Sequence, residues 1–149
     1  MNISKYTLVT ECMTVSPVTL LPTDTMEAAQ EALQKHHFHH LPVTDAQGHL
    51  VGILSFHDYM RVIRNIFGTP SELKEDARYL STILVQDVMT DQHQIIALDV
   101  RATLEDALRL FRANKFHALP IIDKNNKLSG IITVYDLLKM LEDHYLCVS

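Results

Sequence analysis

The sequence lacks the features that mark several classes of protein. Only two cysteines, Cys12 and Cys147, occur in 149 residues, with no Cys-x-x-Cys pair and no companions at metal-ligand spacing. We therefore expect two reduced thiols in a cytoplasmic protein. Apolar runs reach only about five residues, far short of the roughly 20 that span a bilayer. No membrane partner is predicted. The lead-in from Met1 to Met13 has no continuous apolar core, so no signal peptide is predicted either.

Basic charge and catalytic motifs are also scarce. The net charge of −5 argues against broad contact with nucleic acid or anionic membranes. There is no glycine-rich phosphate loop, no nucleophile with a base at an informative spacing and no metal motif, so we predict that the chain is not an enzyme. An apolar fraction of 47% with 21% charged residues is typical of a compact globular protein.

One short pattern occurs twice. Residues 52–58 read Gly-Ile-Leu-Ser-Phe-His-Asp and residues 130–136 read Gly-Ile-Ile-Thr-Val-Tyr-Asp, so that Asp58 and Asp136 are 78 residues apart. Each copy follows a predicted strand and precedes a predicted helix. The copies indicate a duplicated β-α-β-β-α unit, and neither half would bury both faces of its sheet alone.

The flanking residues predict the same elements in both halves. In the first half, Asp24 and Glu27 form a plausible capping box for a helix that ends near His36. That helix follows a short strand over 18–22, and its apolar stripe consists of Met26, Ala29 and Leu33. Strands at 41–43 and 50–54 around a turn at 45–48, and a helix over 56–67, complete the first half.

In the second half, Met89-Thr90 matches Met13-Thr14, and a strand over 95–98 precedes the helical stripe of Leu104, Ala107, Leu108 and Phe111. Residues 116–120 match 38–42, a turn covers 123–127, and a last helix reaches about Leu146. A linker helix over 71–84 has no counterpart. It could cover the surface, lengthen an interface or tether the repeats.

The same ordered set of motifs occurs twice over about residues 12–142. Each copy has Met-Thr, a strand, an amphipathic helix, Leu-Pro-Val or Leu-Pro-Ile, and Gly-h-h-Ser/Thr-x-x-Asp, where h is an apolar residue. This tandem set resembles a pair of cystathionine-β-synthase (CBS) domains. The resemblance implies an α+β fold in which two repeats pack about a pseudo-twofold axis, with small mixed sheets facing a shared interface and helices outside. It implies a stand-alone pair divided into a lead-in (1–11), repeat 1 (12–67), a linker (68–87), repeat 2 (88–146) and a tail (147–149).

Such pairs commonly bind adenosine-containing ligands in two clefts between the sheets. The resemblance assigns Thr133, Asp136, Val18, Phe38, His39 and His40 to one cleft. It assigns Ser55, Asp58, Ile96, Phe116, His117 and Ala118 to the other. Positions that hold basic residues in members binding several phosphates carry histidine or alanine here, which argues against a highly charged ligand.

The residues themselves support this chemistry without requiring it. Ser55 and Thr133 offer hydroxyls to a phosphate or ribose near unpaired backbone N–H groups, and the aspartates would accept hydrogen bonds from ribose hydroxyls. Ser-x-x-Asp and Thr-x-x-Asp are equally ordinary helix caps, and capping does not exclude binding. Gly52 and Gly130 would let a ligand or a neighbouring strand approach closely.

The histidines at 36, 37, 39 and 40 invite a metal interpretation, but only His39 has a histidine counterpart, His117. We predict titratable histidines and no metal site.

Two functions remain open. The first is a regulatory sensor that binds AMP, ADP, ATP or S-adenosylmethionine as an effector, requires no cofactor, and alters a partner protein or a dimer. The alternative is an interaction module with vestigial clefts. The apolar helices after each pattern, at 59–67 and 137–145, favour a homodimer.

Overall fold

A computed structural model describes residues 2–36, 38–67, 77–113 and 116–146. The chain forms two compact units, one of residues 18–95 and one of residues 1–17 with 96–149. The two units are called the Asp58 unit and the Asp136 unit below, after the carboxylate that each contains.

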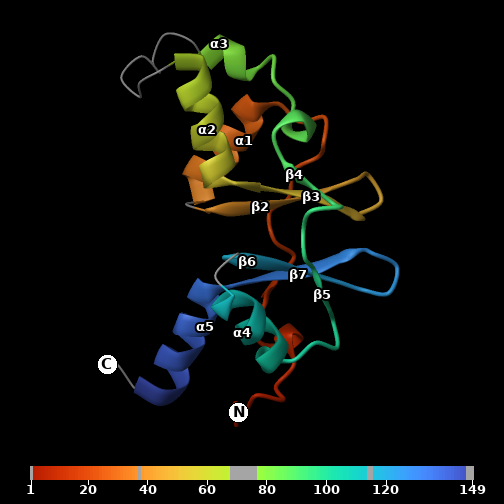
Figure 1. Cartoon of the computed structure of the whole chain (residues 1–149), viewed down its shortest axis with the longest axis vertical. Coiled ribbons are helices and arrows are strands. Elements are labelled where there is room, and N and C mark those ends of the chain that lie inside the picture. Colours follow the sequence, from red (N-terminus) through yellow and green to blue (C-terminus); the bar gives the residue numbers. More distant parts are fainter. Residues whose placement is uncertain (1, 37, 68–76, 114–115, 147–149) are drawn as a thin grey trace. The chain divides into compact units, whose positions relative to one another are not determined.

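The Asp58 unit is an antiparallel sheet with helices on one of its faces (Figure 1). Its strands lie in the order β2-β3-β4, and α1 and α2 cover the same side. Along the chain its elements are α1 (Met26–His36), β2 (His40–Thr44), β3 (Leu50–Ser55), α2 (Phe56–Phe67), α3 (Ala77–Leu80), the 3₁₀ turn η3 (Val85–Asp87) and β4 (Thr90–Asp91).

The Asp136 unit contains a mixed sheet of order β1-β7-β6-β5, in which β5 runs parallel to β6. Its elements are η1 (Val9–Glu11), β1 (Thr14–Val15), β5 (Leu98–Asp99), α4 (Leu104–Arg112), β6 (Ala118–Ile122), β7 (Leu128–Thr133), α5 (Val134–Leu141) and the π-helical turn η4 (Glu142–Leu146). The predicted α+β class with two repeats is confirmed.

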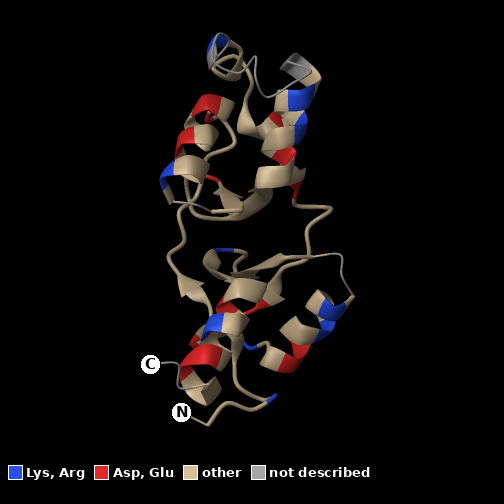
Figure 2. Cartoon of the chain, turned by 90° about the vertical axis from the view of Figure 1, so that its left-hand side faces the viewer, with Lys and Arg blue, Asp and Glu red and all other residues tan. Residues whose placement is uncertain are grey.

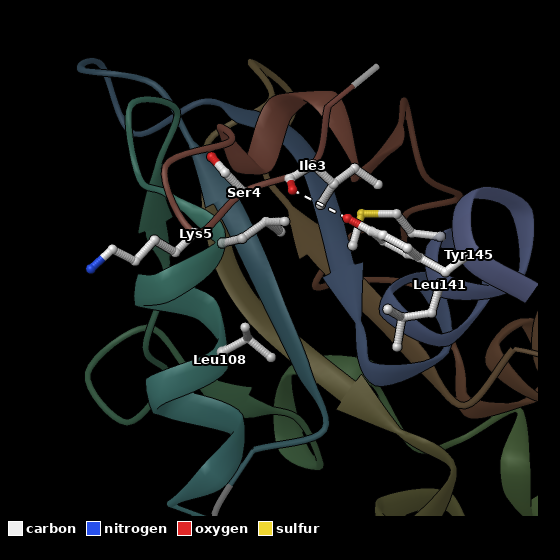
Figure 3. A pocket seen from close by; sticks show the side chains of 8 residues that line it. Ile3, Ser4, Lys5, Leu108, Leu141 and Tyr145 are labelled. Carbon is white, nitrogen blue, oxygen red and sulfur yellow. Dashed lines mark hydrogen bonds between the residues drawn. The ribbon is translucent and has the colours of Figure 1, made fainter.

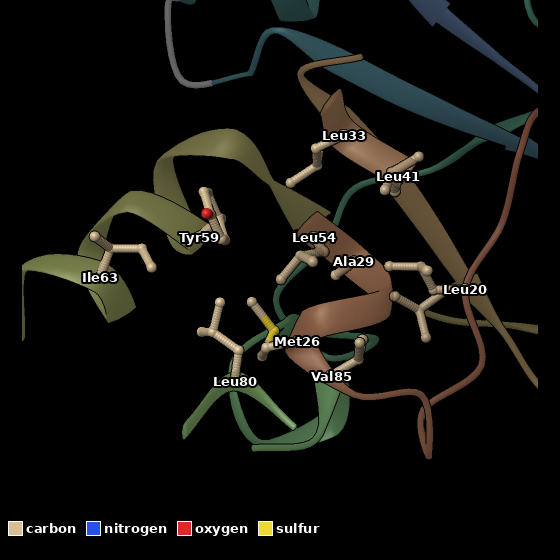
Figure 4. Close-up of a cluster of buried hydrophobic side chains, with 11 residues drawn as sticks. Leu20, Met26, Ala29, Leu33, Leu41, Leu54, Tyr59, Ile63, Leu80 and Val85 are labelled. Atoms are coloured by element: carbon tan, nitrogen blue, oxygen red, sulfur yellow. The ribbon is translucent and has the colours of Figure 1, made fainter. Parts of the chain in front are cut away.

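Each unit has its own apolar core, built on the predicted helical stripes. Met26, Ala29 and Leu33 of α1 pack with residues of β2, β3 and α2 in the Asp58 unit (Figure 4). In the Asp136 unit, Leu104 and Ala107 are buried as predicted. Leu108 is 43% exposed, contrary to its place in the predicted stripe. The predicted apolar stripe therefore marks the buried face of α4, except at Leu108.

The predicted strands at 18–22 and 95–98 are much shorter than expected. Leu20 alone forms a parallel bridge with Val43, and its N–H donates to the Pro42 carbonyl over 3.0 Å. Two prolines, Pro17 and Pro22, remove donors on either side of this bridge. In the second repeat, β5 covers only Leu98–Asp99, because the N–H groups of residues 94 and 95 donate to the Asp91 carbonyl in a turn.

The cap of α1 also differs from the predicted Asp24 and Glu27 box. The Thr25 hydroxyl accepts from the Ala28 N–H over 3.2 Å and so caps the helix. The Asp24 carboxylate accepts from the Leu21 N–H over 2.7 Å, which commits it to the turn before the helix. A threonine beside an aspartate offers two capping oxygens, and the turn decides which is used.

Packing exchanges the first strands of the two sequence repeats. Thr14–Val15 pair with β7 of the second repeat, and Thr90–Asp91 pair with β3 of the first. The compact units therefore differ from a division at residues 12–67 and 88–146.

Part of the predicted linker belongs to the Asp58 core, because Leu80 is 1% exposed there. Residues 68–76 of the linker lie outside the described part of the chain.

The paired glycines permit this exchange of strands. A Cβ atom added to Gly52 would meet the Met89 sulfur and lie 2.9 Å from the Thr90 carbonyl oxygen. At Gly130 the corresponding distance to the Thr14 carbonyl oxygen is 2.7 Å. Of the two approaches predicted for these glycines, that of a neighbouring strand is confirmed.

Substituting Gly130→Ala should lower the free energy of unfolding by about 1–3 kcal/mol, because a backbone carbonyl cannot move aside cheaply. Urea denaturation measures the change. The matched control is Ser129→Ala at the preceding strand position, which adds no atom and should alter stability by less than about 0.5 kcal/mol. Equal effects of the two substitutions would contradict the close approach.

Candidate functional site

Ser55 and Asp58 join the end of β3 to the first turn of α2 by a reciprocal pair of hydrogen bonds. The Asp58 N–H donates to Ser55 Oγ over 3.0 Å, and the Ser55 N–H donates to Asp58 Oδ2 over 3.0 Å. Asp58 is only 8% exposed. Its other oxygen, Oδ1, accepts from Arg61 Nη2 over 3.3 Å. The pattern is therefore a capping box, as one of the two sequence interpretations predicts.

Thr133 and Asp136 repeat this geometry between β7 and α5. The Asp136 N–H donates to Thr133 Oγ1 over 3.2 Å, and Asp136 Oδ2 accepts from the Thr133 N–H over 2.8 Å. Asp136 Oδ1 accepts from the Thr14 hydroxyl over 3.3 Å. Thr14 is a candidate site residue that was not predicted, although the Met-Thr pair that recurs at residues 89–90 was a signal for it.

The Phe-His segment of each repeat lies beside the capping box of the same repeat. His40 is opposite Ser55 in the β2–β3 register, and the Phe56 N–H donates to the His39 carbonyl over 2.7 Å. The His39 ring meets the Phe56 ring edge-on, with centroids 5.9 Å apart. The cluster is called the Asp58 set below, and it comprises Phe38, His39, His40, Ser55 and Asp58.

The second repeat forms a corresponding Asp136 set of Phe116, His117, Ala118, Thr133 and Asp136. Ala118 is opposite Thr133 in the β6–β7 register. The Val134 N–H lies 3.5 Å from the His117 carbonyl oxygen, a longer contact than its counterpart at His39. Phe116 is half-buried against the core of its own unit.

The remaining predicted residues are less tightly grouped. Val18 packs against the core of the Asp58 unit, and Ile96 is 40% exposed in the Asp136 unit. The resemblance assigns Phe38–His40 and Ser55/Asp58 to opposite clefts, whereas the strand register places both groups within one unit. Their assignment to particular clefts stays a prediction.

Both carboxylates retain acceptor capacity for a ligand. The Thr133 hydroxyl also donates to Asp136 Oδ2 over 3.0 Å. Each carboxylate oxygen has two lone-pair directions, and the Oδ1 atoms of Asp58 and Asp136 each accept one of the hydrogen bonds given above. Ribose hydroxyls are suitable donors to such an acceptor, and a serine or threonine hydroxyl nearby can reach a phosphate or ribose oxygen. The geometry therefore permits capping and ligand binding together.

The Cys12 thiol lies close to the carboxylates of Glu11 and Asp136. Burial raises the pKa of the Cys12 thiol, and the charges of Glu11 and Asp136 raise it further. The Cys12 sulfur lies 3.3 Å from the Met140 sulfur. We therefore expect a protonated, unreactive thiol at this position. Cys147 lies outside the described residues.

The histidines near the Asp58 set engage aromatic rings. His36 stacks on Phe38 with centroids 5.3 Å apart. His37 lies outside the described residues. Within the described ranges, no group of three or more His, Cys, Asp or Glu side chains is arranged to hold a metal ion. The absence of a metal site stays a prediction of the sequence.

Charge is dispersed over the helices of each unit. Figure 2 shows both acidic and basic positions on the helices of both units. In α1 and α4 the first turn carries acidic residues and the last turn carries basic residues. Among the described helices, none is long and apolar enough to cross a membrane.

A groove of about 420 Å³ opens on the Asp136 unit (Figure 3), and neither Thr133 nor Asp136 lines it. Its wall is almost entirely apolar, and the Tyr145 hydroxyl donates to the Ile3 carbonyl over 3.3 Å. The lining residues are Ile3, Ser4, Lys5, Leu104, Leu108, Met140, Leu141 and Tyr145.

The repeat explains why this groove is open. Val9 and Val85, both fully buried, occupy equivalent places 76 residues apart, so Ser4 is the counterpart of Leu80. In the Asp58 unit, Leu80 packs in the core with Met26 and Ile63, the counterparts of Leu104 and Leu141. The polar Ser4 therefore leaves open a space that a leucine fills in the other repeat.

Comparison with known proteins identifies the repeats. Residues 9–65 and 85–143 match the family model of the CBS domain. Inosine-5'-monophosphate dehydrogenase from Methanocaldococcus jannaschii is 35% identical over 122 residues, which are 82% of this chain and 21% of that protein. The chain spans about a fifth of the length of the curated relatives it matches. The overlap covers the CBS region and shows no catalytic domain.

Solved structures are similar over nearly the whole chain. The CBS-pair protein CBSX2 from Arabidopsis thaliana superposes with a TM-score of 0.79 at 27% identity, covering 95% of this chain and 99% of that chain. CBSX2 in complex with AMP gives a TM-score of 0.75 at 28% identity, covering 92% and 97%.

Truncating Leu80→Ala should lower the free energy of unfolding by about 2–5 kcal/mol, because the side chain is fully buried. The matched control is Ser4→Ala at the equivalent place in the other repeat, for which we expect a change below about 0.5 kcal/mol. Thermal and urea denaturation measure both. A Leu80→Ala protein as stable as the control would contradict the equivalence of core and groove.

Proposed function

Because the chain belongs to the CBS domain family, we propose that it is a regulatory module that binds an adenosine-containing ligand. The two carboxylates are its principal ligand groups. The observation that carries the proposal is that one geometry occurs in both repeats. In each, a hydroxyl and a carboxylate are joined by hydrogen bonds beside a segment that contains phenylalanine and histidine.

The individual roles follow from the donors and acceptors present. Asp58 and Asp136 accept hydrogen bonds from ribose hydroxyls, and Ser55 and Thr133 contact phosphate or ribose oxygens at the helix N-termini. Aliphatic and aromatic neighbours such as Phe38 and Ile96 bind the adenine face. The complex of CBSX2 with AMP, at 28% identity, supports this ligand class.

The residue types favour a ligand of low charge. Neither set places a lysine or arginine on the strand that enters Leu-Pro, where His39, His40, His117 and Ala118 stand. One phosphate can be held by hydroxyls, backbone N–H groups and a protonated histidine, whereas a triphosphate needs more cationic partners. We therefore propose AMP or an adenosyl ligand of similar charge before ATP.

Regulation requires that the ligand bind one arrangement of the protein more tightly than another. We propose that this difference is transmitted to a second copy of the chain or to an effector protein. A cytoplasmic location is part of the proposal, and the free thiol of Cys12 supports it.

A second candidate function, self-association, is favoured by the exposed side of α5 and η4. Leu138, Leu141 and Tyr145 are 59%, 45% and 60% exposed. On α2, the corresponding positions include the buried Ile63. Because the α5 surface adjoins the open groove, leucines of a second copy provide suitable side chains to fill it. We propose a homodimer through this surface.

Calorimetric titration with AMP, ADP, ATP, S-adenosylmethionine and NADH tests the ligand proposal. We expect AMP to bind, and Asp58→Ala or Asp136→Ala to weaken or abolish one binding event, by about tenfold or more, because each removes a charged acceptor. No turnover of the nucleotides is expected.

A matched control separates binding from capping. Asp106 forms the same kind of box with Thr103 at the start of α4, and it belongs to neither set. Asp106→Ala should cost about 1 kcal/mol of stability and leave AMP affinity unchanged. The proposal is wrong if AMP does not bind the native chain, or if Asp106→Ala weakens binding as much as the other two substitutions.

Replacing Leu141→Glu should shift a dimer to monomer, because a charge would be desolvated in the apolar interface. Sedimentation velocity over a range of concentrations measures the association. Lys139→Glu, an exposed position on the same helix, is the control for added negative charge. A native chain that stays monomeric at every concentration would refute self-association.

A further inference from the structure

The two carboxylates differ in what binds their second oxygen. Asp58 Oδ1 is paired with the guanidinium of Arg61 at 3.3 Å, whereas Asp136 Oδ1 accepts from the neutral hydroxyl of Thr14 at 3.3 Å. The position equivalent to Arg61 is Lys139, 78 residues later. Within the described part of the chain, Lys139 forms no ion pair with Asp136.

The Arg61 contact competes with the role proposed for Asp58. The Asp58 side chain is 11% exposed, while that of Arg61 is 56% exposed, so the guanidinium reaches a largely buried carboxylate. Oδ2 holds the helix cap through the Ser55 N–H, so we assign the ribose hydroxyls to Oδ1, the oxygen outside the cap. A ribose that binds there must displace or share the guanidinium, and it replaces a charged donor with neutral ones.

The Asp136 set carries no such cost. A threonine hydroxyl can rotate to accept from a ribose hydroxyl while still lying near the carboxylate, because it is both donor and acceptor. The negative charge of Asp136 is also not neutralised by a paired cation. A ribose therefore meets a stronger acceptor at Asp136 than at Asp58.

We propose that Arg61 is a specificity-determining residue that masks Asp58 and makes the two adenosyl sites unequal, with the Asp136 set binding ribose more tightly. This inference rests on the proposed function, since it assumes that both carboxylates bind ribose. The difference in ribose affinity between the two sets then comes from one side chain on α2. It requires no difference between the two capping boxes.

Adenosine is the appropriate probe, because it has the ribose but no phosphate that could interact with Arg61. In an Asp136→Asn background, which leaves the Asp58 set as the intact one, Arg61→Met should tighten adenosine binding by about two- to fivefold, the range expected for loss of a partly exposed ion pair. Competition calorimetry against AMP measures the affinities. In an Asp58→Asn background, Lys139→Met is the matched control and should leave adenosine affinity unchanged.

Salt provides a second readout that a merely structural role of Arg61 would not change. Raising NaCl from about 0.05 to 0.5 M screens the ion pair, so adenosine affinity at the Asp58 set should rise with salt when Arg61 is present. In Arg61→Met it should stay constant. Because adenosine is uncharged, the salt dependence reports on the protein's own ion pair.

The outcomes distinguish this inference from the proposed function. Failure of AMP to bind the native chain would refute the proposed function, and the inference with it. If AMP binds but Arg61→Met leaves adenosine affinity at the Asp58 set unchanged, or adenosine binding there stays undetectable, the masking role alone is overturned.

Discussion

The close approach of a short strand to Gly52 and to Gly130 is the contact on which the rest of each unit depends. Through it, the first strand of each repeat pairs with the sheet of the other repeat. Thr14 therefore lies in the sheet of the Asp136 unit and Thr90 in that of the Asp58 unit. A side chain at either glycine would meet a backbone carbonyl. The same exchange brings the Thr14 hydroxyl to Asp136 and therefore shapes a proposed ligand site.

In the proposed function, capping and ligand binding use different oxygens of the same carboxylates. The reciprocal bonds at Ser55 and Thr133 hold Asp58 and Asp136 rigidly through one oxygen, which leaves the other to interact with Arg61, Thr14 or a ligand. A rigid acceptor loses little conformational entropy on binding. The helix cap is in this sense part of the proposed site and not an alternative to it.

Much of the fold could be predicted from the sequence, because its two copies constrain each other. Apolar periodicity predicts α1 and α4, and the pattern repeated at residues 52–58 and 130–136 predicts the strand-to-helix junctions that hold Asp58 and Asp136. The exchange of first strands between the repeats could not be predicted. Met13-Thr14 and Met89-Thr90 are identical pairs, and no residue near either one indicates which sheet it joins. The open space beside Ser4 also escaped prediction, since it depends on packing between segments far apart in the sequence. The contact of Arg61 with Asp58 lies within one helix turn, but the side-chain conformation decides whether it forms.

The central claim is that ribose hydroxyls bind the carboxylate of Asp136. A crystal structure of the protein grown with AMP tests it most directly, through the distance from the ribose hydroxyl oxygens to the Asp136 carboxylate. The account predicts at least one such distance of about 2.6–3.2 Å, in the range of a hydrogen bond. Bound AMP whose ribose lies out of hydrogen-bonding reach of both Asp136 and Asp58 would contradict it.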